Sequence, residues 1–257
     1  MHTISIIVAT YNAGKYLQNC LDSIILQKDE KTELLIIDGG SKDNTVEIVK
    51  KNQQHITYWV SEPDKGIYDA WNKGISRATG NWIMFLGADD KLVPDAIKCY
   101  TNFMDQNNVN GNFDFISSRV QMIDKNGNPV RIKGWSFEWP LFLKEMTVAH
   151  PGALHSKKLF QQYGKFDTQY KIVGDYEFLL RPGLLLKTLF LNKVTVFMSE
   201  GGVSDSTSAI REYYKAVTMT GEYPKHKALK NAIIVFLKFK IKNIARKLGL
   251  NLYLRKV

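Results

Sequence analysis

Short apolar runs alternate with segments of helical periodicity along the first half of the chain. Apolar runs of this length predict buried strands, here at Ile4–Val8, Leu34–Ile37, Tyr58–Val60 and Trp82–Leu86. Between them, apolar residues recur every three or four positions and predict helices over about residues 17–25, 44–51 and 66–78, and from Pro94 onwards. This alternation is typical of βαβ units and a largely parallel sheet.

The second half of the chain is less regular. We expect strands at Phe113–Ile116 and within Arg119–Ile132, with a turn at Asp124–Gly127. The other elements expected there are a strand over Thr188–Met198 and helices over Ser156–Tyr163, over Asp175–Arg181, and from about Thr207 and Lys225. In the first half, Asn44 followed by Glu47 also predicts a capping box at a helix start.

The composition indicates a folded intracellular protein. With 257 residues, 44% of them hydrophobic, the chain can bury a sizeable core. The two cysteines, Cys20 and Cys99, fall at apolar positions of helical patterns, as expected of core thiols in a reducing compartment. No signal peptide precedes Ile4, and no apolar stretch approaches the roughly 20 residues that span a bilayer. We therefore expect a cytoplasmic location.

The net charge of +10 is concentrated at the end of the chain. Residues 223–257 contain ten Lys or Arg and no acidic residue, which leaves 25 basic and 25 acidic residues in positions 1–222. An even basic excess would favour nucleic-acid binding, but this distribution does not, and no nucleic-acid-binding module is recognisable. We expect a neutral domain over 1–222 with halves 1–110 and 111–222, a basic helical tail over 223–257, and no nucleic-acid partner.

Polar residues follow the ends of the predicted parallel strands. Thr10 and Tyr11 follow the first strand, Asp38 follows the second, and Asp89 and Asp90 follow the fourth. Ligands on such sheets bind at the carboxyl ends of the strands. Two adjacent carboxylates repel one another unless a positive group lies beside them, so a positive group of some kind is expected at this edge.

Six segments, in this order, resemble the motifs of family 2 glycosyltransferases with the GT-A fold: SIIVATYNAGKYL, IIDGGSKDNT, SEPDKGIYDAWNKGISRATG, WIMFLGADD, FDTQYKIVGDYEFLLR and GGVS. The resemblance covers roughly residues 3–205. It implies a mixed, largely parallel α/β sheet flanked by helices, and an inverting transferase that uses a UDP-sugar. The sugar would be a hexose or an N-acetylhexosamine.

The resemblance also implies a metal site. Asp89 corresponds to the family's metal ligand and Asp90 flanks it, while Gly87 stands where many members have a first aspartate. Hard oxygen ligands suit Mn²⁺ or Mg²⁺, whose remaining ligands would be phosphate oxygens and water.

Further residues are implied in nucleotide-sugar binding. They are Thr10, Tyr11, Asp38, Asp64, Asn72 and Asp90. A tyrosine ring can stack on uracil, and the carboxylate of Asp38 can accept the N3 hydrogen; Tyr11 and Asp38 can equally be a packing and a turn residue.

The sequence departs from the family pattern at two further positions of this half. Gly39 replaces a second carboxylate, and Trp71 replaces the usual arginine. The positive charge that binds the nucleotide would then come from Lys65 or Lys73 instead.

Asp175 matches the family's catalytic base, with Gly174 in place of the usual Glu. An inverting transfer needs one carboxylate to take the proton of the acceptor hydroxyl. Alternatively, Asp175 is the N-cap of the helix that it begins. His150 falls where relatives line the acceptor site, although a lone histidine can be structural. The Gly201–Ser204 loop is either a flexible cover over the donor or a simple turn.

The basic tail is expected to lie on an anionic membrane. Its apolar residues, interspersed with lysines and arginines, are Ile233, Ile234, Phe236, Leu237, Ile241, Ile244 and Leu248. Such a helix suits a membrane surface, although it could also pack on the body. The membrane interpretation implies a peripheral protein on the inner face of the cytoplasmic membrane. Its acceptor would be a polyprenyl-diphosphate-linked glycan of O-antigen, capsule or exopolysaccharide synthesis.

Other functions remain as alternatives. A nucleotidyltransferase would use a similar strand edge, but its glycine-rich first loop and following arginine are missing. A membrane-attached sugar-nucleotide-binding protein without turnover is suggested by Gly87 and Gly174. The Gln-x-x-Arg-Trp motif of processive synthases does not occur, which favours single addition. The sequence leaves open which sugar is transferred, and to which hydroxyl.

Overall fold

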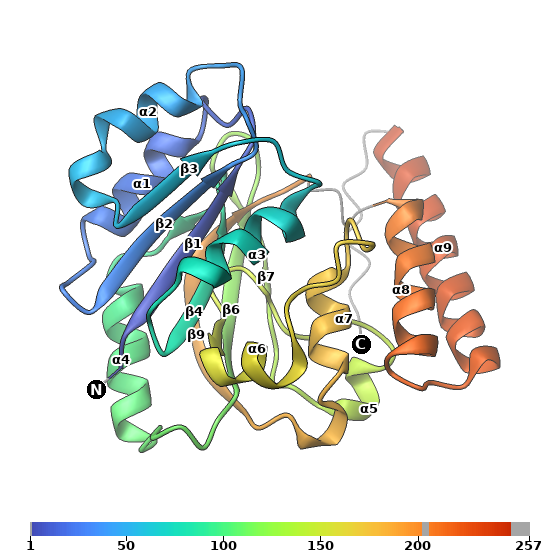
Figure 1. Cartoon of the computed structure of the whole chain (residues 1–257). Coiled ribbons are helices and arrows are strands. Elements are labelled where there is room, and N and C mark those ends of the chain that lie inside the picture. The colour runs from blue at the N-terminus through green and yellow to red at the C-terminus, as the bar shows by residue number, and fades with distance from the viewer. Residues whose placement is uncertain (1, 202–205, 248–257) are drawn as a thin grey trace.

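The computed structural model describes residues 2–201 and 206–247 (Figure 1). Within these residues the strands form one sheet in the order β3-β2-β1-β4-β8-β6-β9-β5, with β7 paired to β6. The strands are β1 (Ile4–Thr10), β2 (Thr32–Asp38), β3 (Tyr58–Ser61), β4 (Trp82–Gly87), β5 (Lys91–Leu92), β6 (Phe115–Ile123), β7 (Pro129–Lys133), β8 (Leu154–Ser156) and β9 (Thr188–Ser199).

Helices cover both faces of this sheet, as Figure 1 shows. They are α1 (Leu17–Ile25), α2 (Thr45–Lys51), α3 (Ile67–Arg77), α4 (Ala96–Gln106), α5 (Trp139–Phe142), α6 (Lys157–Tyr163), α7 (Gly174–Leu180), α8 (Thr207–Met219) and α9 (Lys225–Lys247), with 3₁₀ turns η1 (Gln53–His55) and η2 (Gly183–Leu185). Residues of β1 show why two layers form: Ile6 and Val8 pack with α1, α2 and α4, whereas Ile7 packs with α3, α6 and α7. A strand buried on both faces has to be apolar at every position.

The predicted first half is confirmed as a parallel unit. β3, β2, β1 and β4 are adjacent and parallel. The second half joins the same sheet through β8, which is antiparallel to both β4 and β6. The expected halves 1–110 and 111–222 therefore share one sheet, which is mixed rather than wholly parallel.

Three local expectations need correction. One strand, β6, replaces the two expected between Phe113 and Asp124, although the turn before β7 is present. The Asn44 side chain makes no capping bond; Asp43 accepts the amide of Thr45 at 3.0 Å in its place. The helix α7 begins at Gly174 after the N-cap Val173, so Asp175 lies inside the first turn and the N-cap alternative is wrong.

Both cysteines are free thiols; Cys20 is buried and Cys99 is half-buried. No helix within residues 2–201 and 206–247 is long and apolar enough to cross a bilayer.

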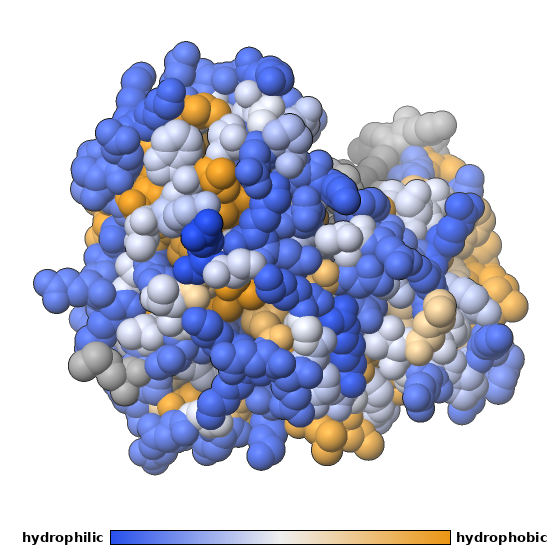
Figure 2. Space-filling view, viewed as in Figure 1, coloured by the Kyte–Doolittle hydropathy of each residue, from blue (hydrophilic) through white to orange (hydrophobic). Residues whose placement is uncertain are grey.

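The tail helix α9 packs on α8, buries Ala245 near its end as well as two alanines near its start, and exposes larger apolar side chains between them. Ala228 and Ala232 are buried, and Ala228 joins the core on the α3 side of the sheet. The exposed large apolar side chains, each 39–60% accessible, are Leu229, Ile233, Ile234, Val235, Phe236, Leu237, Ile241 and Ile244. Figure 2 shows apolar surface along the outer side of α9. Leu248 lies outside the described residues.

Candidate functional site

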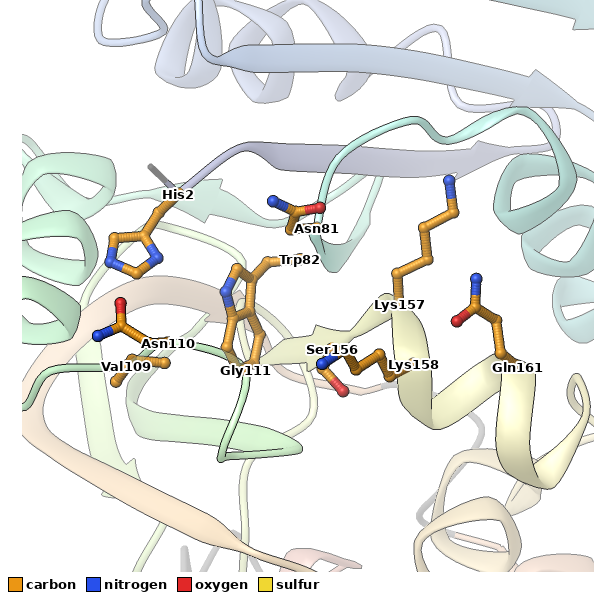
Figure 3. A pocket seen from close by; sticks show the side chains of 10 residues that line it. All are labelled: His2, Asn81, Trp82, Val109, Asn110, Gly111, Ser156, Lys157, Lys158 and Gln161. Carbon is orange, nitrogen blue, oxygen red and sulfur yellow. The ribbon is translucent and has the colours of Figure 1, made fainter.

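The predicted strand-end residues come together at one edge of the sheet. Thr10 pairs in register with Asp38, Asp38 with Ser61, and Ala9 with Gly87. Parallel strands end at the same edge, so the loops after β1, β2, β3 and β4 are neighbours there. A hollow of about 460 Å³ lies at the opposite end of β4, near Asn81, Lys157 and Lys158 (Figure 3). It is therefore not part of this edge.

Asp38 organises the turn after β2. Its carboxylate accepts hydrogen bonds from the hydroxyls of Thr10, Ser41 and Ser61 and from the amides of Gly40 and Ser41. Burial by itself would raise the pKa of Asp38, but the hydrogen bonds from Ser41, Ser61 and Thr10 outweigh it and lower that pKa. The side chain is 1% exposed, so both of its oxygens are committed to the fold.

The side chains of Tyr11 and Asp64 both lie over Gly39. Tyr11 is 65% exposed. A Cβ atom at Gly39 would lie 2.5 Å from Asp64 Oδ2 and 3.3 Å from Tyr11 Cδ2. Asp64 Oδ1 accepts the Gly66 amide at 2.8 Å, which fixes the carboxylate with Oδ2 next to Gly39. An aromatic ring and a carboxylate are thus presented side by side.

The carboxylates of Asp89 and Asp90 converge over Gly87. A Cβ atom there would lie 2.9 Å from Asp90 Oδ2 and 3.0 Å from Asp89 Oδ1. Asp89 is exposed, whereas Asp90 is 5% exposed and accepts the Ser199 amide of β9 at 3.1 Å. Burial, and then the charge of Asp89, raise the pKa of Asp90 to about 7.

This arrangement fits a hard divalent cation. Two carboxylate oxygens face one space that any side chain at position 87 would fill, and a cation placed there would relieve their repulsion. In residues 2–201 and 206–247, no group of three or more His, Cys, Asp or Glu side chains could complete a metal site. Phosphate oxygens and water would therefore have to supply the other ligands.

Asn72 and Lys73 have structural partners. The Asn72 side chain donates to the carbonyl of Phe166 at 2.8 Å and accepts the backbone N–H of Phe166 at 3.0 Å. These two bonds join α3 to the segment before α7. Lys73 Nζ lies 2.9 Å from a Glu62 carboxylate oxygen and 3.0 Å from the Pro63 carbonyl. Trp71 packs in the core against Phe85. The predicted nucleotide contact of Asn72 thus stays a prediction without geometric support.

Asp175 lies at the start of α7, beside α3. Its Oδ1 is 2.9 Å from the hydroxyl of Tyr68 on α3, and its side chain is 16% exposed. Burial raises the pKa of Asp175 to about 6, although the hydrogen bond from Tyr68 acts in the opposite direction. A carboxylate with such a pKa can take up a proton near neutral pH.

His150 places Asp175 near the carboxyl end of β4. His150 Nδ1 is 3.8 Å from Asp175 Oδ2, and the imidazole stacks on Phe85, two residues before Gly87. Burial lowers the pKa of His150 to about 3, so the imidazole is neutral and the contact is not an ion pair. The Nε2 atom is buried without a hydrogen-bond partner.

Two residues near Asp175 were not predicted from the sequence. Tyr68 looks like a core aromatic of α3, and its contact with Asp175 joins positions 107 residues apart. Glu212 of α8 accepts the amides of Lys171, Ile172 and Val173 and thereby holds the loop that leads into α7. No local sequence pattern predicts either contact. Of the expected donor cover, Gly201 is described, with a φ of 104°, and residues 202–204 lie outside the described residues.

The family model of glycosyl transferase family 2 matches residues 5–164. The chain belongs to glycosyl transferase family 2. A PGL/p-HBAD biosynthesis glycosyltransferase of Mycobacterium tuberculosis is 30% identical to this glycosyltransferase over 224 residues, which cover 84% of each chain. Chondroitin synthase of Pasteurella multocida is 28% identical over 200 residues, which cover 74% of this chain and 20% of the synthase.

Solved structures confirm the GT-A fold of this glycosyltransferase. S. aureus TarS in complex with UDP-GlcNAc matches it with a TM-score of 0.66 and 19% identity, covering 91% of this chain and 71% of that one. The mannosyltransferase PcManGT from Pyrobaculum calidifontis, in complex with GDP-Man and Mn²⁺, matches with a TM-score of 0.62 and 16% identity, covering 92% and 74%. The expected α/β class with helices on both faces is therefore confirmed.

Proposed function

We propose that this glycosyltransferase moves a sugar from a UDP-sugar, with inversion, to a hydroxyl of a lipid-linked glycan at an anionic membrane surface. The observation that carries the proposal is the lone carboxylate of Asp175, which has a raised pKa and lies near the strand end where Asp89 and Asp90 converge. One carboxylate suffices for an inverting transfer, because the acceptor attacks directly and needs no covalent intermediate.

The donor would lie across the loops after β1 to β4. Tyr11, which is 65% exposed, would stack on the nucleobase, and Asp64 Oδ2 would accept its N3 hydrogen, since the two side chains lie together over Gly39. We move this contact from Asp38 to Asp64 because Asp38 is already saturated with donors. Thr10 would act indirectly, through its bond to Asp38.

Asp89, with Asp90 beside it, would hold Mn²⁺ or Mg²⁺ against the diphosphate. A bound cation supplies charge neutralisation for the departing nucleoside diphosphate. A chain of contacts along β4 connects the Asp89–Asp90 pair to Asp175. Phe85 of β4 stacks on His150, and His150 in turn faces Asp175. His150, neutral and partly unsatisfied, would border the acceptor.

Asp175 would take the proton of the acceptor hydroxyl as that oxygen attacks the anomeric carbon. Its pKa of about 6 leaves it ionised at cytoplasmic pH and basic enough to accept a proton. The acceptor would be lipid-linked, because α9 exposes apolar side chains among lysines that suit anionic lipid. A polyprenyl-diphosphate-linked precursor of O-antigen, capsule or exopolysaccharide, on the inner face of the cytoplasmic membrane, has the required chemistry.

A binding protein without turnover is less well supported. It was suggested by Gly87 and Gly174, but packing accounts for both glycines. Carboxylates occupy the space beside Gly87, and an aromatic ring occupies the space beside Gly174.

The proposal is tested with UDP-glucose, UDP-galactose, UDP-GlcNAc and UDP-GalNAc, each with Mn²⁺ and with EDTA. One of them should raise the unfolding temperature in Mn²⁺ only. It should then support transfer to a polyprenyl-diphosphate-linked sugar, with an inverted linkage by NMR. Stabilisation by GDP-mannose instead, or a retained anomeric configuration, would refute the donor or the mechanism respectively.

A further inference from the structure

The Tyr68 hydroxyl has two partners on the α7 side of the molecule. It lies 2.9 Å from Asp175 Oδ1 and 2.8 Å from the carbonyl oxygen of Ile172. The ring is 4% exposed and packs against Trp71 and Phe166, with centroids 5.5 Å away in each case. Packing therefore fixes where the hydroxyl can be.

The hydroxyl has one proton for these two acceptors. When Asp175 is ionised, the proton is best placed on Asp175 Oδ1, because a hydrogen bond to a charged acceptor is about twice as strong as a neutral one. When Asp175 is protonated, the carboxyl can donate to the Tyr68 oxygen, and the hydroxyl can donate to Ile172. Tyr68 therefore contacts Asp175 in both protonation states and holds Oδ1 in one place.

Room for the Tyr68 ring depends on the absence of a side chain at position 174. A Cβ atom at Gly174 would lie 2.9 Å from Tyr68 Cε2 and 3.0 Å from Cδ2 and Cζ. Contacts under about 3 Å between such atoms force a shift, and both partners here are rigid, one an aromatic ring and the other helical backbone. The tyrosine and the glycine thus form one interlocked pair.

We propose that Tyr68 is the positioning residue of the base: it holds Oδ1 of Asp175 so that Oδ2 faces the acceptor, in a space that glycine at position 174 leaves open. This inference rests on the proposed role of Asp175. It explains why a glycine occupies the position where the resemblance leads one to expect a glutamate.

The other groups that face Asp175 do not supply this bond. His150, ahead of β8, is neutral and 3.8 Å away. Glu212 of α8 bonds the amides ahead of α7 and, as a like charge, raises the pKa of Asp175. Tyr68 alone among these three donates to the carboxylate.

The first test measures the pKa of Asp175 by ¹³C NMR titration of the unliganded, full-length protein. Tyr68→Phe keeps the ring and removes the hydroxyl, so the pKa should rise by about one unit, as expected for a lost hydrogen bond to a charge. With the donor found in the screen above, the acid limb of turnover should move to higher pH by the same amount, while KM for the donor stays unchanged.

Tyr176→Phe is the matched control. Tyr176 is also a buried tyrosine of this region, but its hydroxyl donates to the carbonyl of Phe142. Its loss should lower the unfolding temperature and leave the pKa of Asp175 in place. If Tyr68→Phe behaves in the same way, Tyr68 is only structural and the proposal is overturned.

Gly174→Ala provides the second variant, and it applies even if Tyr68→Phe fails to fold. The added methyl group should displace the ring and raise the pKa of Asp175. In the Tyr68→Phe background it should add no further rise, since the hydroxyl is already gone. An equal, additive rise in both backgrounds would overturn the interlock. Full turnover of Asp175→Asn would instead refute the proposed base, whatever the titrations show.

Discussion

The turn after β2 and the start of α7 each hold an aspartate, and the two are treated in opposite ways. Asp38 accepts five hydrogen bonds and has a lowered pKa. Asp175 accepts a single hydroxyl, that of Tyr68, against three at Asp38, besides the amides of Asp175 and Tyr176, and its pKa is raised to about 6. Burial acts on both, so the number of donors decides the outcome. A carboxylate with many hydrogen-bond donors stabilises the fold and is a weak base. A buried carboxylate with few donors has a raised pKa and can accept a proton.

The largest effect is expected at the pair Asp89 and Asp90, at the end of β4. Asp89→Ala should abolish transfer and Mn²⁺ binding, measured by EPR titration, because the exposed carboxylate at the converging pair is lost. The fold should persist, since the residue leaves no cavity. EDTA should stop the wild type, and Mn²⁺ or Mg²⁺ should restore it. Full wild-type activity in EDTA would contradict the metal assignment.

Asp175→Asn should lower turnover by roughly 10²-fold to 10⁴-fold, the usual loss for a general base. Affinity for the UDP-sugar, measured by calorimetry, should stay near wild type. In the wild type, turnover should rise with pH through about 6, as Asp175 loses its proton. Loss of donor binding with turnover per bound donor intact would identify Asp175 as a nucleotide ligand.

The same variant should also be more stable at pH 8, by about 1–3 kcal/mol. The folded-state pKa of Asp175 is raised above its ordinary value. Its contribution to stability is therefore complete at low pH and is lost as the pH rises through about 6. Asparagine removes that pH dependence. Urea unfolding at pH 4 and pH 8 measures the difference, and equal effects at both pH values would contradict it.

Asp38→Ala should behave in the reverse manner. It leaves buried donors without an acceptor, which costs about 1–3 kcal/mol or more of unfolding free energy. Turnover of the folded fraction should change less than in Asp175→Asn. Denaturant midpoints and turnover at a temperature well below unfolding separate the two effects. Unchanged stability would show that the network around Asp38 matters little.

The smallest catalytic effect is expected at α9. Replacing the exposed Ile233, Leu237 and Ile241 with Gln should weaken binding to anionic liposomes without unfolding, because none of these side chains is buried. Transfer to a short water-soluble acceptor should be unchanged, whereas transfer to a lipid-linked acceptor in membranes should fall. Ala228→Gln is the control for packing, since Ala228 is buried and its replacement should destabilise the fold. Liposome binding that survives the triple change would exclude this surface as the anchor.

The sequence predicts the meeting of the ends of β1, β2 and β4 well because its signals are local. Apolar runs set β1, β2 and β4, and the residues that end them necessarily meet when the strands are parallel. The surroundings of Asp175 depend on contacts between residues far apart in the sequence, such as Tyr68 with Asp175, which no periodicity reveals. The three-residue β8 is likewise too short to give a pattern, yet its antiparallel pairing with both β4 and β6 joins the two halves of the sheet. The full set of donors to Asp38 is not visible in the local sequence: Gly40 and Ser41 supply three of the five, but the other two come from Thr10 of β1 and Ser61 of β3.

Glu212 of α8 connects the helix that packs against α9 to the loop that leads into α7. Its carboxylate receives the three consecutive amides ahead of α7, and the helix that carries it packs against α9. α8 also packs directly on α7, where Tyr213 stacks on Tyr176. A substitution that shifts α8 should therefore disturb the loop that leads to Asp175, even though none of its own residues touches the carboxylates at the end of β4.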